Sequence, residues 1–267
     1  MRRRPEPARE RPGSFGKTAE MRVEGETWRL SLADGRATTV HTASYSLADT
    51  RAEVVHITPE APLEVWCDRS GIRDAIAGGF SVKPELEPLG DLWVDGRPVA
   101  HRAFAEPWHA RRAAIAIADG HIAIDYRDRL PARPGVGLLQ AGPLLVRDGR
   151  SAITGIEDPE GFAATCAEFD QDLTAGREPR LAIALTSERI VVLAADGRTD
   201  EDAGLTLWEL ADSLVALGAH SALNLDGGSA AVLVADGRRV NTPRTDEGED
   251  MEASSPTVSA IRFRSDR

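Results

Sequence analysis

Besides Asp226-Gly227, which is considered below, six Asp-Gly pairs recur along the 267-residue chain, and most are flanked by short apolar or alternating stretches. Asp-Gly suits the two central positions of a type I′ turn, which need positive φ, so each pair predicts a β-hairpin. Several hairpins imply extensive antiparallel sheet, and their irregular spacing excludes a repeat array. The pairs are Asp34-Gly35, Asp95-Gly96, Asp119-Gly120, Asp148-Gly149, Asp196-Gly197 and Asp236-Gly237.

Helical patterns are fewer than strand patterns. The clearest spans residues 206–217, where leucines and alanines share one face and Thr206 with Glu209 forms a capping box. A second helix is predicted over 158–172, because Asp at the N-cap followed by Pro at N1 favours a helix start. A third, shorter helix is expected near 68–77.

Strands and helices interleave, without a long linker after residue 20. The sequence therefore predicts an α+β fold, in which a hairpin-rich, largely antiparallel sheet packs with a few helices. Residues 1–20 are polar and Pro-rich and are expected to form a mobile N-terminal arm. Residues 21–267 are expected to form a single domain, long enough to bury its own core.

Charge and hydropathy exclude several classes of partner. Asp and Glu number 43 against 32 Lys and Arg, so the net charge is −11. Nucleic-acid binding needs clustered cations and is not expected. No apolar run is long enough for a membrane-spanning helix, so no membrane partner is expected. No apolar segment follows the basic N-terminus, so no secretory signal is predicted and a cytoplasmic location is expected by default.

Several common catalytic and metal motifs are absent from the sequence. Cys67 and Cys166 are too few for a zinc site or a disulfide framework; buried, reduced thiols are expected, and one bridge stays open. The six histidines lack metal-ligand spacing. Without a Gly-x-Ser-x-Gly elbow, a Walker A loop or a Gly-x-Gly-x-x-Gly helix start, serine-hydrolase, kinase and hydride-transfer chemistry have no support.

The densest candidate site lies at 222–229, directly after the best helix. Asn224 and Asp226 alternate with leucines, so their side chains share one face of a predicted strand. Gly227 and Gly228 permit a close backbone approach and leave N–H groups that could point at an anion. Another hairpin turn with a surface aspartate remains an equally good interpretation of this spacing alone.

Four further segments are candidates, each with a simpler structural interpretation. Gly78-Gly79 follows an apolar run and could be only a bulge or turn. Arg180 begins a predicted strand and could be only a solvated or ion-paired arginine, as most isolated arginines are. Asp196-Gly197-Arg198 could be another hairpin, and Asn241 a plain loop residue.

These short segments carry more weight as an ordered set than singly. In chain order they are Ala77-Gly78-Gly79-Phe80, Val94-Asp95-Gly96-Arg97, Ala141-Gly142-Pro143, Pro179-Arg180, Asp196-Gly197-Arg198, Leu217-Gly218, Asn224-Leu225-Asp226-Gly227-Gly228-Ser229 and Val240-Asn241. The succession resembles the phosphodiester glycosidase family over roughly residues 70–265. The chain departs from the family pattern at Ala77, which replaces Asn, at Leu181, which replaces Thr, and in having two glycines where three are usual.

The resemblance implies a hydrolase that cleaves the glycosidic C–O bond of a sugar-1-phosphodiester and releases a phosphate monoester. Such a site needs a carboxylate near the anomeric carbon and fixed donors for the phosphate. On this basis Asp226 and then Asp196 are the expected catalytic carboxylates. The expected substrate-binding residues are Arg180 and Arg198 as a phosphate clamp, Gly78, Gly79, Gly227 and Gly228 as backbone contacts, and Asn224, Ser229 and Asn241 for sugar hydroxyls.

No cofactor is expected to be required. Asp226 and Asp196 could hold a hard cation such as Ca²⁺ or Mg²⁺ through oxygen ligands, so use of a metal stays open. The expected partner is a small sugar phosphodiester, and homo-oligomerisation is left open. Ala77 and the short glycine loop also leave a second interpretation, a non-catalytic protein that binds glycosyl phosphates or nucleotide sugars.

Overall fold

The computed structural model describes residues 24–118, 120–133, 135–154, 158–162 and 176–265, which form three sheets and a short two-stranded ribbon. The largest sheet has seven strands. In spatial order they are β1 (Glu24–Ser31), β2 (Ala37–Ser46), β15 (Arg189–Ala195), β14 (Arg180–Leu185), β16 (Ser221–Asn224), β12 (Leu144–Arg147) and β13 (Arg150–Ser151). All six neighbouring pairs are antiparallel.

Two five-stranded sheets complete the framework. One orders β10 (His121–Tyr126), β9 (Ala113–Ala118), β11 (Gly137–Gln140), β7 (Leu92–Val94) and β8 (Arg97–Pro98). The other orders β18 (Arg238–Arg239), β17 (Leu233–Ala235), β4 (Ala75–Ala77), β19 (Thr257–Ser265) and β3 (Thr50–Ala61). The ribbon pairs β5 (Ser81–Val82) with β6 (Glu87–Pro88). The described strands pair antiparallel throughout, which confirms the predicted sheet type.

Most of the Asp-Gly pairs do form the predicted hairpins. Asp95, Asp148 and Asp236 have φ near +50°, and each following glycine is also positive, as a type I′ turn requires. Asp34-Gly35 lies in the longer loop of the β1–β2 hairpin. Gly120 lies in the loop of the β9–β10 hairpin, and residue 119 is outside the described part of the chain. The hairpin interpretation of Asp196-Gly197 is wrong, because β15 ends at Ala195 and the chain continues toward the next helix.

Two α-helices are described, and the sequence placed only one of them well. Helix α3 (Leu207–Ala216) has the predicted capping box and buries the leucine face of 207, 210 and 214 on the seven-stranded sheet. Helix α1 (Leu63–Ser70) lies upstream of the predicted 68–77, because Gly71 ends it in a left-handed conformation and 75–77 form β4 instead. Its Pro62 N-cap makes no side-chain cap, so the usual start signal was missing.

The remaining short elements and predictions concern turns and undescribed segments. Single 3₁₀ turns occur at η1 (Arg127–Arg129) and η2 (Gly228–Ala230). Most of the helix predicted at 158–172, the arm at 1–20 and Cys166 lie outside the described residues, whereas Cys67 is a free, buried thiol. Neither described α-helix is long and apolar enough to cross a membrane.

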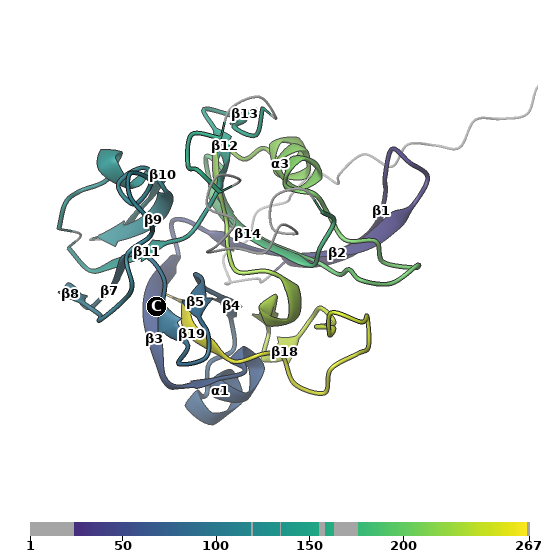
Figure 1. The fold of residues 1–267 in the computed structure, drawn as a ribbon, viewed down its shortest axis with the longest axis horizontal. Helices are drawn as coiled ribbons and strands as arrows, with labels where there is room; N and C mark the ends of the chain where they lie inside the picture. Colours follow the sequence, from purple (N-terminus) through teal and green to yellow (C-terminus); the bar gives the residue numbers. More distant parts are fainter. Residues whose placement is uncertain (1–23, 119, 134, 155–157, 163–175, 266–267) are drawn as a thin grey trace, which may run out of the picture.

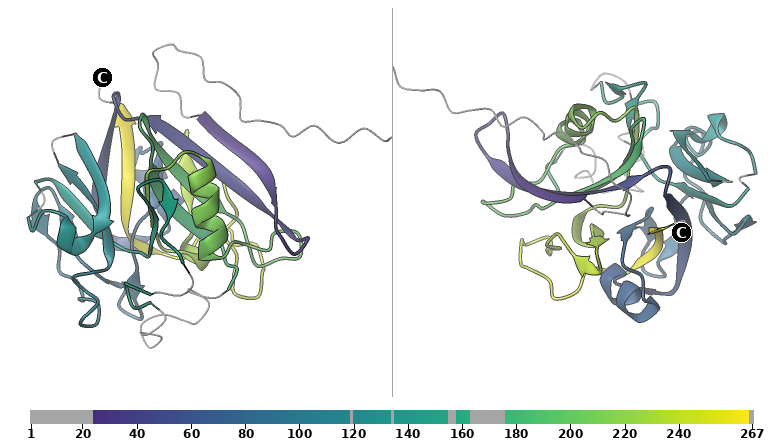
Figure 2. Two further views of the ribbon diagram at one scale, coloured as in Figure 1. Left: turned by 90° about the horizontal axis from the view of Figure 1, so that it is seen from above. Right: turned by 180° about the vertical axis from the view of Figure 1, so that it is seen from behind.

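The sheets share one large apolar core. Figure 1 places α3 at one end of the molecule and α1 at the other, with the strands between them. Figure 2 shows the long β1–β2 hairpin extending from the body beside α3. The main core cluster draws buried side chains from all three sheets, including Ile76 of β4, Ile115 of β9 and Leu223 of β16. The ends of β4, β14 and β16 are therefore held close together.

The capping box gives a test of how α3 is stabilised. Thr206→Ala removes the side-chain oxygen that accepts the Glu209 N–H at 3.1 Å. We expect the free energy of unfolding to fall by about 1 kcal/mol, measured by urea denaturation. Asp212→Ala, at an exposed position of the same helix, is the control and should change stability much less. Equal effects of the two substitutions would contradict this account of the helix start.

Candidate active site

Three chain segments that are far apart in sequence meet directly after β16. The Leu225 N–H donates to Leu181 O at 3.0 Å, and the Gly228 N–H donates to Pro179 O at 3.0 Å. Between them, the Asp226 N–H donates to Gly78 O at 2.9 Å. We call residues 78–79, 179–181 and 225–228 the seam, because these bonds join the seven-stranded sheet to the sheet that contains β4.

Asp226 carries the only carboxyl group among the seam residues. The side chain belongs to a half-buried residue, and its Oδ1 accepts the Gly227 N–H at 3.0 Å. Burial raises the pKa of Asp226 to about 7, although the Gly227 hydrogen bond and the positive charge of Lys83 both favour the carboxylate. A carboxyl group that titrates near neutral pH can either accept or donate a proton in catalysis.

Lys83 is a residue that the sequence interpretation did not assign to the site. It lies between β5 and β6, shortly after the Gly78-Gly79 segment, and its side chain is exposed. Its charge acts on Asp226, and no carboxylate of the described residues forms an ion pair with it. No sequence motif indicated that Lys83 lies near Asp226. The sequence features that could have drawn attention to it are its place four residues after Gly79 and the rarity of lysine, which occurs twice in the chain.

The paired glycines at 78 and 79 allow the close approach of neighbouring strands. A Cβ on Gly78 would lie 2.4 Å from the Ser259 Oγ and 2.9 Å from the Ser259 carbonyl carbon. A Cβ on Gly79 would lie 2.8 Å from Gln140 O. Both glycines are therefore required by packing, and the Gly78 carbonyl can reach Asp226 only because no side chain intervenes.

The expected anion-binding role of the backbone N–H groups needs correction. The Gly79 N–H donates to Ser259 Oγ at 3.1 Å, the Gly227 N–H to Asp226, and the Gly228 N–H to Pro179. Each N–H is thus already paired within the protein. The glycines shape the seam and fix Asp226, and phosphate oxygens must find other donors.

The two asparagines predicted to contact sugar also have structural partners. Asn224 is 1% exposed, and its Nδ2 donates to Gly142 O at 2.9 Å and Leu225 O at 3.0 Å, while its Oδ1 is buried without a hydrogen-bond partner. Asn241 is 4% exposed; its Oδ1 accepts the Leu233 N–H at 2.9 Å. Such buried amides position backbone and do not meet a substrate directly, which corrects their predicted role.

Ser229 differs from the two asparagines because it is only half-buried. Its hydroxyl lies 2.7 Å from the hydroxyl of Ser255, and either oxygen can donate. The Ser255 N–H also donates to Ser229 O at 3.0 Å. The segment before β19 therefore lies against Gly227 and Gly228, which we call the glycine loop. A hydroxyl pair at this position keeps both donor and acceptor capacity for a sugar hydroxyl.

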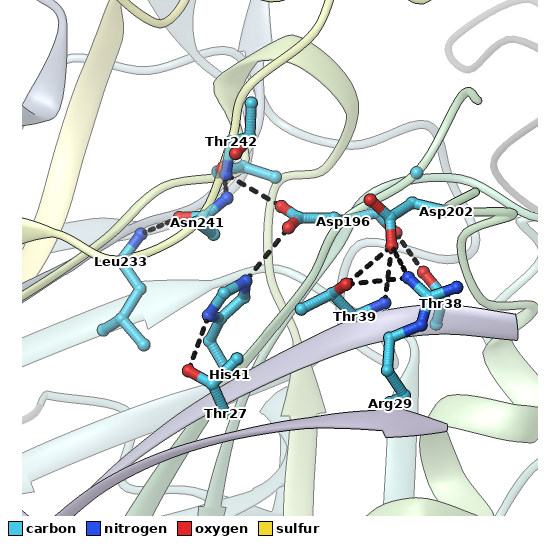
Figure 3. A network of polar contacts seen from close by, with 12 residues as sticks. Thr27, Arg29, Thr38, Thr39, His41, Asp196, Asp202, Leu233, Asn241 and Thr242 are labelled. Atoms are coloured by element: carbon cyan, nitrogen blue, oxygen red, sulfur yellow. Dashed lines mark hydrogen bonds and ion pairs between the residues drawn. The ribbon is translucent and has the colours of Figure 1, made fainter. Parts of the chain in front are cut away.

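Asp196, the second expected catalytic carboxylate, lies in a buried polar network (Figure 3). It is 4% exposed; Oδ1 accepts the Thr242 N–H at 2.8 Å, and Oδ2 lies 3.0 Å from His41 Nε2. Because a carboxylate only accepts, His41 donates through Nε2, and its Nδ1 faces the Thr27 hydroxyl at 3.0 Å. Both oxygens are occupied, so we reinterpret Asp196 as a positioning residue that joins β2 to the chain before Pro243.

The two arginines predicted as a phosphate clamp occupy different environments. Arg180 is 1% exposed and donates to the carbonyl oxygens of Leu205 at 3.0 Å and Gly176 at 2.9 Å. It therefore anchors the chain that leads into α3, which corrects its expected role. Arg198 lies beside the glycine loop, and its side chain is 16% exposed. Of the two, Arg198 alone is placed to meet a ligand at the seam.

The geometry does not define a metal centre. Among the described residues, no group of three or more His, Cys, Asp or Glu side chains could hold a metal ion. The Asp196 oxygens, one of the two predicted ligand sources, already have protein partners. The sequence left metal use at Asp226 open, and the geometry adds no further ligand to it.

Sequence comparison identifies the class of protein that this seam belongs to. The family model for phosphodiester glycosidases matches residues 70–262. The chain therefore belongs to the phosphodiester glycosidase family, as the ordered motifs predicted. It is 30% identical over 204 residues to N-acetylglucosamine-1-phosphodiester alpha-N-acetylglucosaminidase of Mus musculus, covering 72% of this chain and 37% of that protein. The protein of the same name from Homo sapiens is 29% identical over 213 residues, covering 75% of this chain and 39% of its own length.

Solved structures share the fold at lower sequence identity. The catalytic domain of the zebrafish N-acetylglucosamine-1-phosphodiester alpha-N-acetylglucosaminidase superposes with a TM-score of 0.68 at 19% identity, covering 91% of this chain and 83% of that one. A protein from Burkholderia pseudomallei gives a TM-score of 0.63 at 14% identity, covering 86% of this chain and 74% of that one. The chain spans less than two fifths of the length of the curated mouse and human relatives.

The raised pKa of Asp226 predicts a pH-dependent cost to stability. Between about pH 4 and 7 the folded chain keeps a proton on Asp226 that the unfolded chain releases, so this residue makes stability fall as pH rises. Asp226→Asn removes that cost. We expect the variant and wild type to be equally stable near pH 4. Near pH 8 the variant should be more stable by about 1–2 kcal/mol, after allowance for partial solvent screening.

The measurement is urea unfolding of both proteins at several pH values. Asp212→Asn, on the exposed face of α3, serves as the control and should show no gap that grows with pH. A gap between wild type and Asp226→Asn that stays constant from pH 4 to 8 would contradict the burial of this carboxyl.

Proposed function

We propose that the chain hydrolyses the bond between the anomeric carbon and the ester oxygen of a sugar-1-phosphodiester. The observation that carries this proposal is the half-buried Asp226 carboxyl, fixed by its own backbone at the seam and titrating near pH 7. Family membership supports hydrolysis of a phosphodiester-linked sugar as the reaction class. The names of the mouse and human relatives favour an N-acetylglucosamine-1-phosphodiester as the first compound to test.

The chemistry asks for a carboxylate more than for a strong acid. When the anomeric C–O bond breaks, its electrons go to the phosphate, which leaves as a weakly basic monoester. The demanding step is formation of an oxocarbenium-like sugar beside that anion. In the proposed mechanism the Asp226 carboxylate stabilises this cation or takes a proton from the attacking water, whose oxygen becomes the anomeric hydroxyl of the sugar.

Groups around Asp226 supply the remaining contacts in this proposal. Lys83 is exposed, and its positive charge acts at Asp226, so it is suited to hold a phosphate oxygen next to the reacting carbon. Arg198 offers a second cation, whose guanidinium lies beside Gly228. The Ser229 and Ser255 hydroxyls supply polar contacts for the sugar. A substrate with an internal negative charge fits these two cations better than a neutral glycoside does.

Substitution of Asp226 tests the catalytic assignment. We expect Asp226→Asn to lose turnover of an N-acetylglucosamine-1-phosphodiester by on the order of 10²-fold or more, because the neutral amide cannot stabilise the cation or accept a proton. The readout is the phosphate monoester released, with thermal unfolding as a check that the variant is folded. Wild-type rates in a folded Asp226→Asn protein would remove Asp226 from the mechanism.

An isotope experiment identifies the bond that breaks. Hydrolysis in ¹⁸O-labelled water should place the label on the sugar, because water attacks the anomeric carbon. Label in the phosphate monoester would instead mean cleavage of a P–O bond, which is phosphodiesterase chemistry. Tight binding of the ester without either product would favour the alternative of a non-catalytic glycosyl-phosphate binder.

The charge of Lys83 gives a third test, through the pH profile. Activity should rise with pH as Asp226 ionises, and Lys83→Met should move this acidic limb to higher pH because the pKa of Asp226 loses a lowering influence. KM should also rise, since a phosphate contact is lost. Lys83→Arg keeps the charge and should restore the position of the limb. An unchanged limb in Lys83→Met would mean that Lys83 does not act on the reacting carboxyl.

A further inference from the structure

Arg198 has an unusual backbone conformation that directs its side chain to the seam. Its φ is +71°, a region that residues other than glycine seldom adopt and that the surrounding structure must stabilise. The Nη2 atom would lie 3.0 Å from a Cβ placed on Gly228. The guanidinium therefore lies directly against Gly228, two residues from Asp226, where a side chain would press on it.

The three nitrogen atoms of this guanidinium, which carry five N–H donors, have partners of very different exposure. Nε donates to Glu178 Oε2 at 2.8 Å, and Nη1 donates to the Arg244 carbonyl oxygen at 3.0 Å. Nη2, the atom beside Gly228, pairs with Asp246 Oδ1 at 2.8 Å. The Glu178 side chain is 20% exposed, whereas the Asp246 side chain is 82% exposed. An ion pair with one partner so fully in water contributes little to stability and is readily exchanged.

The loop that carries Asp246 is folded onto Arg198. Figure 1 shows this segment, after β18, as a yellow-green loop at the edge of the molecule. The Thr245 N–H donates to Glu249 O at 2.9 Å, and the Gly248 N–H donates to Thr245 O at 3.0 Å, so the loop closes on itself. Gly248, with φ of +86°, packs against the Arg198 carbonyl oxygen. A second ion pair joins Asp250 to Arg244 at 2.8 Å, on a different guanidinium.

We infer that Asp246 holds on Arg198 the position that an anionic phosphate oxygen of the substrate takes, so that substrate must displace this carboxylate to bind. A carboxylate and a phosphate oxygen accept the same charge-assisted N–H bond, and among the described residues Asp246 is the carboxylate that meets Nη2 beside Gly228. Asp246 is then a residue that sets affinity: as a tethered competitor it lowers binding of every phosphate ligand at Arg198. The inference rests on the proposed function for the identity of the natural anion.

The test compares two substitutions in the same loop. Asp246→Asn removes the competing charge, whereas Asp250→Asn removes another exposed charge, which pairs with Arg244 instead. Binding of inorganic phosphate is measured by calorimetry at low salt, which requires no turnover. We expect Asp246→Asn to bind phosphate about two- to fivefold more tightly than wild type, as loss of one exposed ion pair allows, and Asp250→Asn to bind it as wild type does.

The double variant Asp246→Asn with Arg198→Gln should lose this gain in phosphate affinity. Equal affinity in wild type and Asp246→Asn, or an equal gain in Asp250→Asn, would overturn the inference. In the first case phosphate does not compete with Asp246, and in the second the effect is general charge. Tighter phosphate binding by Asp246→Asn together with no hydrolysis of sugar phosphodiesters by wild type would instead reject the proposed function and leave the inference standing.

Discussion

The backbone hydrogen bonds of residues 225–228 are the constraint on which the candidate site depends. They tie the chain after β16 to Gly78 on one side and to Pro179 and Leu181 on the other. Such bonds require backbones to approach without side chains between them, and a Cβ on Gly78 or Gly227 would come within 3.0 Å of a neighbouring atom. The glycines are therefore needed first for architecture, and the position of the Asp226 carboxyl follows from it.

Burial separates the polar residues of the site into two kinds. Asn224, Asn241, Asp196 and Arg180 are almost fully buried, and their side chains hydrogen-bond to the loops around the seam. Such groups are costly to leave unpaired, so they hold loops in one arrangement. The exposed and half-exposed groups, Asp226, Lys83, Ser229 and Arg198, are the ones that can meet a ligand. The proposed chemistry uses only the second kind, and the first kind fixes its geometry.

Local sequence rules predicted much of the fold, because hairpins and capped helices are decided by neighbouring residues. The type I′ pairs at Asp95, Asp148 and Asp236 and the capping box at Thr206 are examples. The same rule failed at Asp196-Gly197, where the aspartate bonds to His41 and Thr242 from distant segments. That bonding is tertiary and leaves no local trace. Helix α1 was misplaced for a related reason, since its start has no side-chain cap.

The sequence predicted which segments form the candidate site, but it did not predict which of their side chains are available to a ligand. The ordered motifs predicted that the segments around 79, 180, 196 and 226 meet in one region. The structure joins 78–79, 179–181 and 225–228 by hydrogen bonds and packs Gly197 against Pro179, while the Asp196 side chain turns to His41 and Thr242. Which side chains remain available depends on burial and on partners, and neither can be obtained from spacing. Arg180 and Arg198 look alike in sequence, yet one anchors backbone and the other faces the glycine loop. Lys83 contributes through a hairpin that no motif connects to Asp226.

The most direct test of the central claim is a crystal structure with a non-hydrolysable analogue, a sugar whose anomeric carbon is joined to a phosphonate ester. We expect the anomeric carbon to lie about 3–3.5 Å from an Asp226 carboxylate oxygen, the range of a reactive approach. The phosphonate should lie toward Lys83 and Arg198, with Asp246 displaced. An analogue bound elsewhere, for example in the 520 Å³ cavity beside Arg51 and Asp95, with the seam empty, would contradict the account.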